Sequence, residues 1–357
     1  MANVFWENKE NIGALKMLSP GTPLREGLEN VLRAKTGALI VIGDSEDVLD
    51  IVDGGFNLNS EFSPAYLYEL AKMDGSIILS TDAKKILYAN AQLLPDSSIV
   101  TKETGTRHRT AERVARQTGK MVISISQRRH IITLYKGSEK YIIEDTSKIL
   151  TKANQAVQTL EKYKIVLDQF LTNLSALEFE ELVTLYDVVM VVQKIEMLMR
   201  VVNELERYII ELGNEGRLVK MQMDELMGSV KDEYKYIFKD YINSKAEYKE
   251  FKEEIKDLTT EDLLDNVSIA KLLGYTGTQA SLDESVYSKG YRILHKIQRL
   301  PSNVIENLTD TFTSLSSITN ASIQELDDVE GIGEIRARHI KNGIRRIKEQ
   351  MLLDRHI

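Results

Sequence analysis

The chain concentrates phosphate-binding groups in its first third. Residues 104–109 read Thr-Gly-Thr-Arg-His-Arg, which places two guanidinium groups, an imidazole and two hydroxyls close together. Arginine binds phosphate through paired hydrogen bonds, and the other groups can donate single ones. A surface loop needs far less of this chemistry, so the segment predicts a nucleotide site.

A carboxylate lies upstream of this segment, in Asp74-Gly75-Ser76, directly before an apolar run. Asp74 could hold a divalent metal there or assist a reacting hydroxyl. Asp-Gly pairs also form ordinary turns before strands, and the dipeptide alone favours that interpretation. Only its combination with residues 104–109 points to a nucleotide site.

Other polar groups have both a functional and a structural interpretation. Residues 126–129, Ser-Gln-Arg-Arg, follow an apolar run and suit either a triphosphate tail or a solvated turn. Residues 53–56 contain two glycines that could admit a ligand, but a turn is the stronger interpretation. His108 taken alone could equally donate a hydrogen bond to a phosphate oxygen or be an ordinary polar side chain. Its neighbours favour the phosphate contact.

A second pattern lies near the C-terminus. Residues 321–326, the turn at residues 330–333 and residues 336–340 predict a helix, a glycine hairpin and a second helix whose Ala337 and Ile340 pack inward. Glycine lets the backbone approach a phosphate, and a helix N-terminus attracts anions. We interpret this as a helix-hairpin-helix module, in preference to an ordinary joint between two helices.

The second helix of this module is basic, with no acidic residue between Arg336 and Lys348. Such cations position a protein on a sugar-phosphate backbone without reading bases. The expected DNA contacts are Gly331, Ile332, Gly333, Arg336, Arg338 and Lys341.

Composition limits the possible settings. A chain of 357 residues can hold two or three domains, and 43% hydrophobic with 28% charged residues is typical of a globular protein. The absence of cysteine excludes disulfides, thiolate catalysis and zinc–cysteine sites. The net charge of −8 confines any DNA contact to a local basic patch. No secretory signal or membrane span is recognisable, so we expect a cytoplasmic protein.

The nucleotide segments lie in a region that alternates helix and strand, at about residues 24–141. Short apolar runs predict buried strands, and prolines and glycines mark helix ends. A helix opens at Pro23 and ends near Gly37, and Ser63 caps another. Thr106 or Thr110 could cap a helix that begins near Ala111 and stops at Gly119. The expected strands are residues 38–42, 76–79, 86–89, 121–125 and 131–134, which indicates an α/β domain with a mixed sheet flanked by helices.

A helical pattern follows, at about residues 147–265. Leucines and valines recur at three-, four- and seven-residue steps, and residues 182–202 are apolar enough for a helix buried on several sides. Residues 231–256 are highly charged and predict a solvated helix face. We expect a helical spine between domains, with no chemistry of its own.

Over essentially its whole length the sequence resembles the DNA integrity scanning family of bacterial diadenylate cyclases. Residues 67–76, residues 103–113 and the C-terminal helix-hairpin-helix carry the resemblance. The family pattern usually has alanine where Ser76 stands, which leaves Asp74 and Gly75 intact. The resemblance implies a cyclase domain at residues 1–146, an all-helical spine at 147–285 and a DNA-binding domain at 286–357.

The resemblance also implies a reaction, in which two ATP molecules form cyclic di-AMP and two pyrophosphates across a face-to-face subunit interface. Asp74 would bind Mg²⁺ or Mn²⁺ and assist deprotonation of the 3′-hydroxyl. The implied partners are ATP, branched DNA that suppresses the cyclase, and further copies of the chain in an octamer. The implied catalytic residues are Asp74, Arg107, His108 and Arg109, and the implied nucleotide contacts are Gly75, Ser76, Leu93, Thr106, Arg107, His108, Arg109, Thr110, Ser126 and Arg129.

Two other functions stay open at this point. One is a branched-DNA-binding structural protein whose nucleotide domain is inactive, against which the intact Asp74 and Arg107-His108-Arg109 speak. The other is a different magnesium-dependent nucleotidyl-transfer enzyme, such as a polymerase or nuclease. Those enzymes gather several carboxylates around their metals, whereas only Asp74 is convincingly placed here.

Overall fold

The computed structural model describes residues 9–244 and 247–354 of the chain. They form two compact units. The first comprises residues 9–156 and Glu204–Met221, and the second comprises Val157–Asn203, residues 222–244 and residues 247–354.

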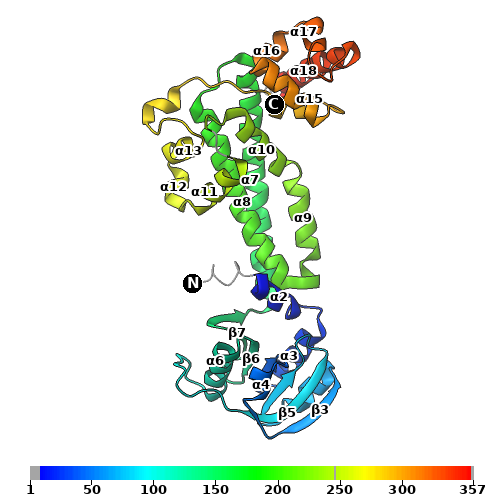
Figure 1. The fold of residues 1–357 in the computed structure, drawn as a ribbon, viewed down its shortest axis with the longest axis vertical. Helices are drawn as coiled ribbons and strands as arrows, with labels where there is room; N and C mark the ends of the chain where they lie inside the picture. The colour runs from blue at the N-terminus through cyan, green and yellow to red at the C-terminus, as the bar shows by residue number, and fades with distance from the viewer. Residues whose placement is uncertain (1–8, 245–246, 355–357) are drawn as a thin grey trace. The chain divides into compact units, whose positions relative to one another are not determined.

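The first unit contains a mixed sheet of eight strands among the described residues (Figure 1). The strand order is β2-β5-β4-β1-β6-β7-β8, with β3 paired to β5. Strands β1 and β4 are parallel, and the other neighbours are antiparallel. The strands are β1 Ala38–Ile42, β2 Val52–Asp53, β3 Phe56–Glu61, β4 Ser76–Leu79, β5 Lys85–Leu93, β6 Met121–Ser126, β7 Ile131–Lys136 and β8 Glu139–Ile143.

All five expected strands are present, and the α/β assignment is confirmed. Three further strands have no apolar run to mark them, because β2 is only two residues long, β3 is mostly exposed and β8 alternates half-buried with exposed positions. The glycines between β2 and β3 have positive φ angles of 63° and 81°, so residues 53–56 contain the expected turn.

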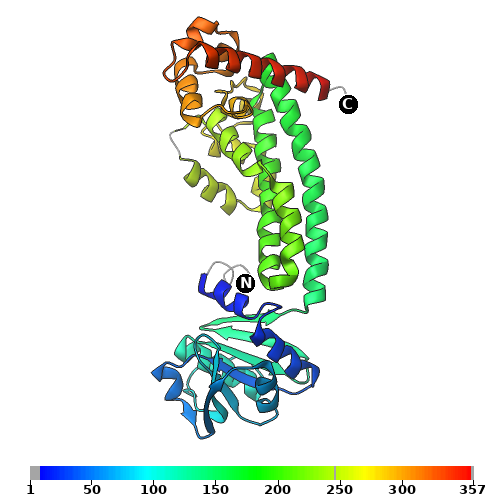
Figure 2. The same ribbon diagram turned by 90° about the vertical axis from the view of Figure 1, so that its right-hand side faces the viewer.

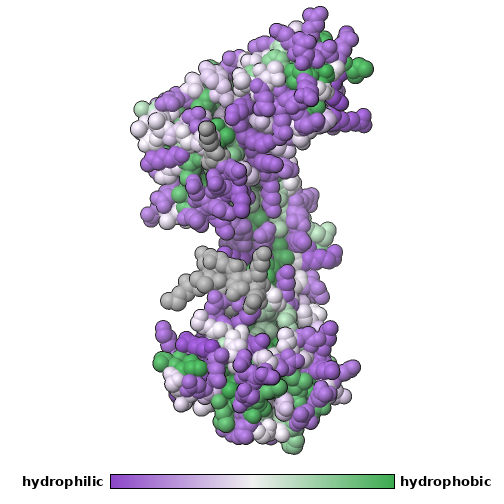
Figure 3. Space-filling model, in the orientation of Figure 1, coloured by the Kyte–Doolittle hydropathy of each residue, from purple (hydrophilic) through white to green (hydrophobic). Residues whose placement is uncertain are grey.

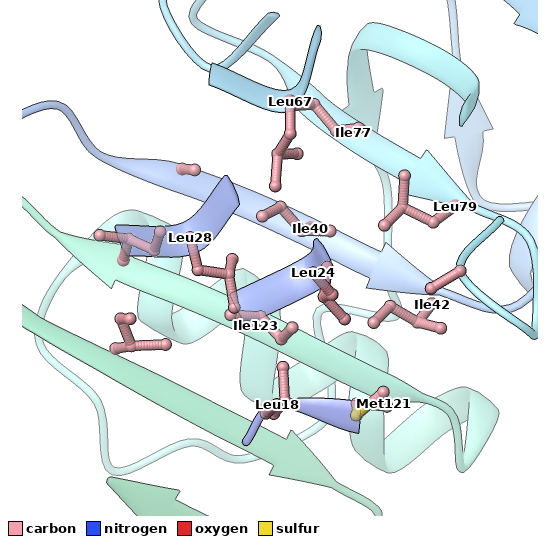
Figure 4. Close-up of a cluster of buried hydrophobic side chains, with 14 of the residues drawn as sticks. Leu18, Leu24, Leu28, Ile40, Ile42, Leu67, Ile77, Leu79, Met121 and Ile123 are labelled. Atoms are coloured by element: carbon pink, nitrogen blue, oxygen red, sulfur yellow. The ribbon is translucent and has the colours of Figure 1, made fainter. Parts of the chain in front are cut away.

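Side chains of β1 alternate between the two faces of the sheet. Ile40 and Ile42 pack under α3 and α5, and Figure 4 shows Leu24 and Leu28 of α3 against them. Leu39 and Val41 point to the other face, which α6 and α4 cover. Helices on both faces therefore bury the sheet. The helices of this unit are α2 Lys9–Met17, α3 Pro23–Arg33, α4 Glu46–Leu49, α5 Pro64–Leu70 and α6 Thr106–Thr118.

The expected helix ends need two corrections. Helix α3 ends at Arg33, before Gly37. Helix α6 begins at Thr106 rather than near Ala111, and its N-cap is Gly105 without a side-chain cap bond, so neither Thr106 nor Thr110 is the cap. The end of α6 at Gly119, with φ +67°, is confirmed, as is the cap of α5 by the Ser63 hydroxyl, which accepts from the Tyr66 N–H.

Residues after β8 are helical, as expected (Figure 2). The apolar stretch within residues 182–202 falls in α8, where Val188, Val192 and Ile195 are fully buried. The bounds are α7 Thr146–Glu180, α8 Leu185–Leu212, η1 Gly213–Gly216, α9 Arg217–Met227, α10 Val230–Tyr241, α11 Tyr248–Asp257, α12 Thr260–Leu264, α13 Asn266–Leu272 and η2 Gln279–Asp283.

The expectation of a solvated helix face at residues 231–256 was wrong in part. The segment contains α10 and α11. Between its charged residues lie aromatic residues whose side chains form a buried cluster. The Phe251 ring packs against both Tyr234 and Phe238, with ring centroids 5.9 and 4.9 Å apart. Apart from the buried Asp240, the charged residues therefore cover only the solvent side of each helix.

The last helices pack around their own apolar core in the second unit. Leu294, Ile305, Leu308, Ala337 and Ile340 are all fully buried in it. On the face shown in Figure 3, hydrophilic side chains dominate the surface of these helices. No helix in the described ranges is long and apolar enough to cross a membrane. The bounds are α14 Tyr291–His295, α15 Ser302–Phe312, α16 Leu315–Asn320, α17 Ile323–Asp327 and α18 Glu334–Asp354.

Candidate functional site

The pairing of the strands brings distant segments of the first unit to one edge of its sheet. Because β4 is parallel to β1, both strands begin there, and β6, antiparallel to β1, ends there, with Ile125 opposite Ala38. Strand β5 also ends there, because Ser76 lies opposite Ala91. We call this place, defined by the starts of β1 and β4 and the ends of β5 and β6, the site edge.

Asp74 lies at the site edge, exposed, just before β4. The next residue, Gly75, is held against β5, where its N–H donates to Asn90 Oδ1 at 3.2 Å. A Cβ on Gly75 would lie 2.3 Å from the backbone carbon of Asn90, so the glycine is required by close packing of two backbones. Asn90 itself has φ +53°, and the local register is irregular. The glycine and Asn90 together fix the position of the Asp74 backbone.

Ser76 and Leu93 turn inward from the same edge. The Ser76 side chain is buried, and its hydroxyl donates to the Ala91 carbonyl at 2.7 Å. Leu93 is 8% exposed and belongs to the core under α6. The hydroxyl that replaces the usual alanine is therefore satisfied inside the sheet.

The first turn of α6 contains Thr106, Arg107 and His108, whose N–H groups lack intrahelical partners, as at any helix start. Such a terminus attracts anions. The Arg107 guanidinium reaches the site edge, because a Cβ on Gly37, just before β1, would lie 2.2 Å from its Nη1 atom. Arg109 is exposed and Thr110 is half-buried.

His108 points onto the sheet rather than toward the edge. Its Nδ1 atom is 3.0 Å from the hydroxyl of Tyr135 in β7, and its Nε2 atom is buried with no hydrogen-bond partner among the described residues. Burial lowers the pKa of His108, although the Glu103 carboxylate acts in the opposite direction. The imidazole is therefore favoured in its neutral form.

Glu103 and Lys140 complete the surroundings of Tyr135. The Lys140 ammonium pairs with Glu103, and it lies 5.9 Å from the centre of the Tyr135 ring. Burial raises the pKa of Glu103, but hydrogen bonds from Lys140 and Tyr135 outweigh it and hold the pKa below its ordinary value. Burial and the Glu103 carboxylate raise the pKa of Tyr135. The carboxylate is thus ionised and the phenol neutral near pH 7.

Residues 126–129 form the turn between β6 and β7 at the site edge. The Ser126 hydroxyl accepts from the Arg129 N–H at 3.2 Å, and both Arg128 and Arg129 are exposed. The turn therefore presents two cations beside the edge.

Four residues of this region had no role predicted from the sequence: Asn90, Glu103, Tyr135 and Lys140. Glu103 adjoins the Thr-Gly-Thr-Arg-His-Arg segment, which could have drawn attention to it. Tyr135 and Lys140 had no such signal, because β8, which carries Lys140, had not been anticipated.

The described residues contain no cluster of three or more histidine, aspartate or glutamate side chains that could hold a metal ion. Asp74 is thus a single exposed carboxylate at the site edge. Mg²⁺ commonly takes one or two carboxylates together with substrate phosphates and water, so one carboxylate fits a metal that arrives with a nucleotide.

In the C-terminal segment, α17 and α18 are joined by a turn in which Gly331 has φ +83° and Ile332 is buried. Gly333 precedes α18 and its carbonyl accepts from the Ala337 N–H at 2.9 Å. The inward packing expected for Ala337 and Ile340 is confirmed.

Three cations of α18, those expected to contact DNA, make contacts within the chain. Arg336 donates to the Gly331 carbonyl, and Arg338 pairs with Glu334 one turn earlier. The Lys341 ammonium donates to the Thr319 carbonyl at 2.7 Å. Arg336 and Arg338 are nevertheless exposed.

Comparison with known proteins agrees with this architecture. The family described as "DisA bacterial checkpoint controller nucleotide-binding" matches residues 25–140, and the "DisA bacterial checkpoint controller linker region" matches residues 143–282. Among solved structures, a double mutant of DacA from Staphylococcus aureus covers 38% of this chain and 91% of its own, at 21% identity and a TM-score of 0.30, a likeness too low to bear on function.

Curated relatives match over nearly the full length. The DNA integrity scanning protein DisA of Clostridioides difficile (strain 630) is 63% identical over 99% of both chains. The protein of the same name from Clostridium perfringens (strain 13 / Type A) is 59% identical, over 96% of this chain and 97% of its own. The resemblance noted in the sequence is thereby confirmed: the chain belongs to the DisA family of DNA integrity scanning proteins, and its α/β unit carries that family's nucleotide-binding domain.

Proposed function

We propose that this protein is a diadenylate cyclase that condenses two ATP molecules into cyclic di-AMP and two pyrophosphates. The observation that carries the proposal is the convergence at the site edge of a lone carboxylate, Asp74, with cations from two other segments, Arg107 and Arg129. Family membership supports the same reaction class.

In each half of the reaction, the 3′-oxygen of one ATP forms a bond to the α-phosphorus of the other, and the bond between the α-phosphorus and the bridging oxygen breaks. Pyrophosphate leaves with that oxygen, and the 3′-hydroxyl gives up its proton. Asp74 would assist this deprotonation. Most of the remaining catalysis is positioning and charge stabilisation.

Mg²⁺ or Mn²⁺ would be held by Asp74 together with the ATP phosphates. When bound, the ion offsets phosphate charge and polarises the reacting phosphorus. The cations of α6 and of the β6–β7 turn act on the same charge from the protein side. The nucleotide contacts in this proposal are Thr106, Arg107, His108, Arg109, Thr110, Ser126 and Arg129 at the phosphates, with Gly75, Ser76 and Leu93 beside the nucleoside.

Two nucleotides must face each other, and each chain offers one site edge, so two subunits would meet face to face. We further propose an octamer in the cytoplasm, with a cyclase domain at residues 1–146, a spine at 147–285 and a helix-hairpin-helix DNA-binding domain at 286–357. The positive φ of Gly331 and the exposed Arg336 and Arg338 support the last assignment.

Branched DNA bound by the C-terminal module would lower cyclase activity. The coupling would pass through the helices between the two domains and misalign facing sites. Gly331, Ile332, Gly333, Arg336, Arg338 and Lys341 would contact the DNA backbone.

The cyclase test uses the purified full chain with ATP and either metal, with nucleotides resolved by chromatography. We expect cyclic di-AMP from the unchanged chain, none from Asp74→Asn, and full activity from Asp50→Asn, which removes an exposed carboxylate after α4. No product from folded, unchanged protein would instead favour a DNA-binding protein with an inactive nucleotide domain.

The DNA test compares Arg336→Ala combined with Arg338→Ala against a control that removes two exposed cations of α11, Lys249 and Lys256. Loss of two phosphate contacts should weaken binding to a four-way junction. The slope of log affinity against log salt concentration should fall by the equivalent of about two released counterions. Equal affinity in both variants would rule out this surface as the DNA contact.

A further inference from the structure

The C-terminal segment repeats one structural unit at a spacing of 32 residues. Helix α14 spans residues 291–295 and α17 spans residues 323–327, while α15 begins at residue 302 and α18 at residue 334, so each bound differs by 32. The buried side chains keep the same spacing, and α14 and α15 therefore form a second helix-hairpin-helix. The equivalent buried pairs are Leu294 with Leu326, Ile297 with Val329, Ile305 with Ala337 and Leu308 with Ile340.

The two hairpins follow the same backbone course. The first hairpin is residues 298–301, Gln-Arg-Leu-Pro, and the second hairpin is residues 330–333, Glu-Gly-Ile-Gly. Arg299 has φ +61° where Gly331 has φ +83°, so an arginine adopts the left-handed conformation that glycine normally supplies. The first hydrogen bond of each following helix is also matched, from the Ile305 N–H to the Pro301 carbonyl at 3.2 Å and from the Ala337 N–H to the Gly333 carbonyl at 2.9 Å.

The two copies contact each other reciprocally. The Asn307 side chain of α15 donates to the carbonyl of Glu330 in the second hairpin at 2.8 Å. Its equivalent in α18, His339, donates from Nε2 to the carbonyl of Gln298 in the first hairpin at 2.9 Å. Contacts that repeat with the two copies exchanged are typical of a twofold axis. The two hairpins therefore lie side by side, related by an approximate twofold rotation.

The first hairpin is less acidic than the second. Glu330 and Glu334 of the second copy are replaced by the uncharged Gln298 and Ser302 in the first, and residues 291–305 contain no acidic residue. Arg299 is exposed and makes no hydrogen bond or ion pair within the part of the chain that the structure describes. The first hairpin thus presents a guanidinium that is available to an anion.

We propose that the first hairpin is a second contact with the DNA backbone, in which the Arg299 guanidinium binds a phosphate. Its side chain prevents the close backbone approach that Gly331 allows, but a guanidinium can hold a phosphate through paired hydrogen bonds. The two strands of a DNA duplex are also related by twofold axes, so each hairpin of a twofold pair can bind one strand. The module thereby binds both strands of one duplex arm. The inference rests on the proposed DNA binding.

The first test measures the affinity of the full chain for a fluorescent four-way junction over a range of salt concentrations. Arg299→Gly should weaken binding about three- to tenfold and lower the slope of log affinity against log salt by the equivalent of about one counterion. Its melting temperature should not fall, because glycine adopts positive φ without strain. Arg299→Asn, which tolerates the same conformation, should lose as much affinity, whereas Arg299→Lys should keep most of it.

A matched control is Lys35→Gly. Lys35 is also an exposed cation with a positive φ, of +55°, but it belongs to the first unit. Both substitutions remove one positive charge and add one glycine. The control should leave the affinity and its salt dependence unchanged, so that a difference between the two variants assigns the contact to the first hairpin.

Cross-linking tests the assignment of the hairpins to two strands. The chain has no cysteine, so Ser302→Cys and Glu334→Cys each introduce a single thiol. The two positions are equivalent in the repeat and both are exposed. Each thiol is modified with a photoreactive aryl azide and irradiated with a four-way junction in which one strand at a time carries an end label. We expect cross-links to opposite strands of the same arm.

Three results would overturn the inference while leaving DNA binding intact. They are unchanged affinity and salt dependence in Arg299→Gly and Arg299→Asn, cross-links from both thiols to one strand alone, and cross-links from Glu334→Cys with none from Ser302→Cys. An unchanged chain that does not bind the four-way junction would instead overturn the proposed DNA binding and the inference together. Cyclic di-AMP synthesis is measured separately and does not depend on either result.

Discussion

Arg292 of α14 and Glu178 of α7 form an ion pair in which both side chains are completely buried. Arg292 also donates to the Ser175 hydroxyl at 3.0 Å, and Glu178 accepts from the Tyr241 hydroxyl at 2.7 Å. Asp240 of α10 accepts from three backbone N–H groups at the start of α14. The network therefore ties α7, α10 and α14 together inside the second unit.

Removing one partner of this pair should be severe. Glu178→Ala leaves the buried guanidinium with only the more distant Glu233 carboxylate, 3.9 Å away, and should cost about 3–5 kcal/mol of stability. Replacing both partners, as Glu178→Leu with Arg292→Met, should recover much of that loss. Melting temperatures should be highest for the unchanged chain, intermediate for the double variant and lowest for Glu178→Ala. The control is Glu349→Ala, which breaks an exposed pair with Arg345 at 3.9 Å and should cost less than about 1 kcal/mol.

Gly75→Ala should destabilise the first unit, because the new methyl would meet the Asn90 backbone, which cannot move without displacing β5. We expect the free energy of unfolding to fall by about 1–3 kcal/mol and nucleotide binding to weaken. Gly13→Ala is the opposite case. It lies within α2 with no atom within 4 Å of the added carbon, and should stabilise by up to about 1 kcal/mol. Equal melting temperatures for the two variants would contradict the close approach at Gly75.

Ser76→Ala separates a structural from a functional role of the hydroxyl. Because Ser76 already donates to the Ala91 carbonyl, its removal should lower stability by about 1 kcal/mol. Affinity for 3′-deoxy-ATP should stay within twofold of the unchanged chain, an expectation that rests on the same satisfied hydrogen bond. A large loss of affinity without a change in melting temperature would show that the hydroxyl contacts the nucleotide.

The lowered pKa of His108 has a consequence for stability. As pH falls below its ordinary value of 6.5, the unfolded chain takes up this proton before the folded chain does. The contribution of the neutral His108 to the free energy of unfolding is therefore complete above pH 6.5 and is lost progressively toward lower pH. His108→Gln should make the melting temperature of the first unit less dependent on pH between 7.5 and about 5.5, a range that follows from the ordinary histidine pKa. The control is Gln127→Ala in the exposed β6–β7 turn, which removes no titratable group and should retain the steeper dependence of the unchanged chain.

The sequence predicted those parts of the fold that are determined locally. Strands such as β1 and β6 are continuous apolar runs, and the cap at Ser63 and the exit at Gly119 depend on neighbouring residues alone. The start of α6 was placed too late, because Gly105 supplies no side-chain cap that a pattern could reveal.

The residues that surround the candidate site could not be predicted from the sequence in the same way. Glu103 and Lys140 meet only because β8 pairs with β7, and Asn90 matters only because β5 lies against Gly75. The buried Arg292 is similar, since nothing in its own sequence neighbourhood distinguishes it from a solvated arginine. Such contacts depend on long-range pairing, which spacing along the chain does not encode.

The pairing of β1 with β6 also bears on synthesis of the protein. Ala38 is paired with Ile125, so the centre of the sheet cannot close until β6 has left the ribosome. Pairing segments this far apart in sequence has a loop-closure entropy cost, which makes this step slower than local helix formation. A nascent chain that already contains Asp74 therefore still lacks the site edge. Since ATP would bind only the closed sheet, cellular ATP would act as a late stabiliser of the finished domain by mass action.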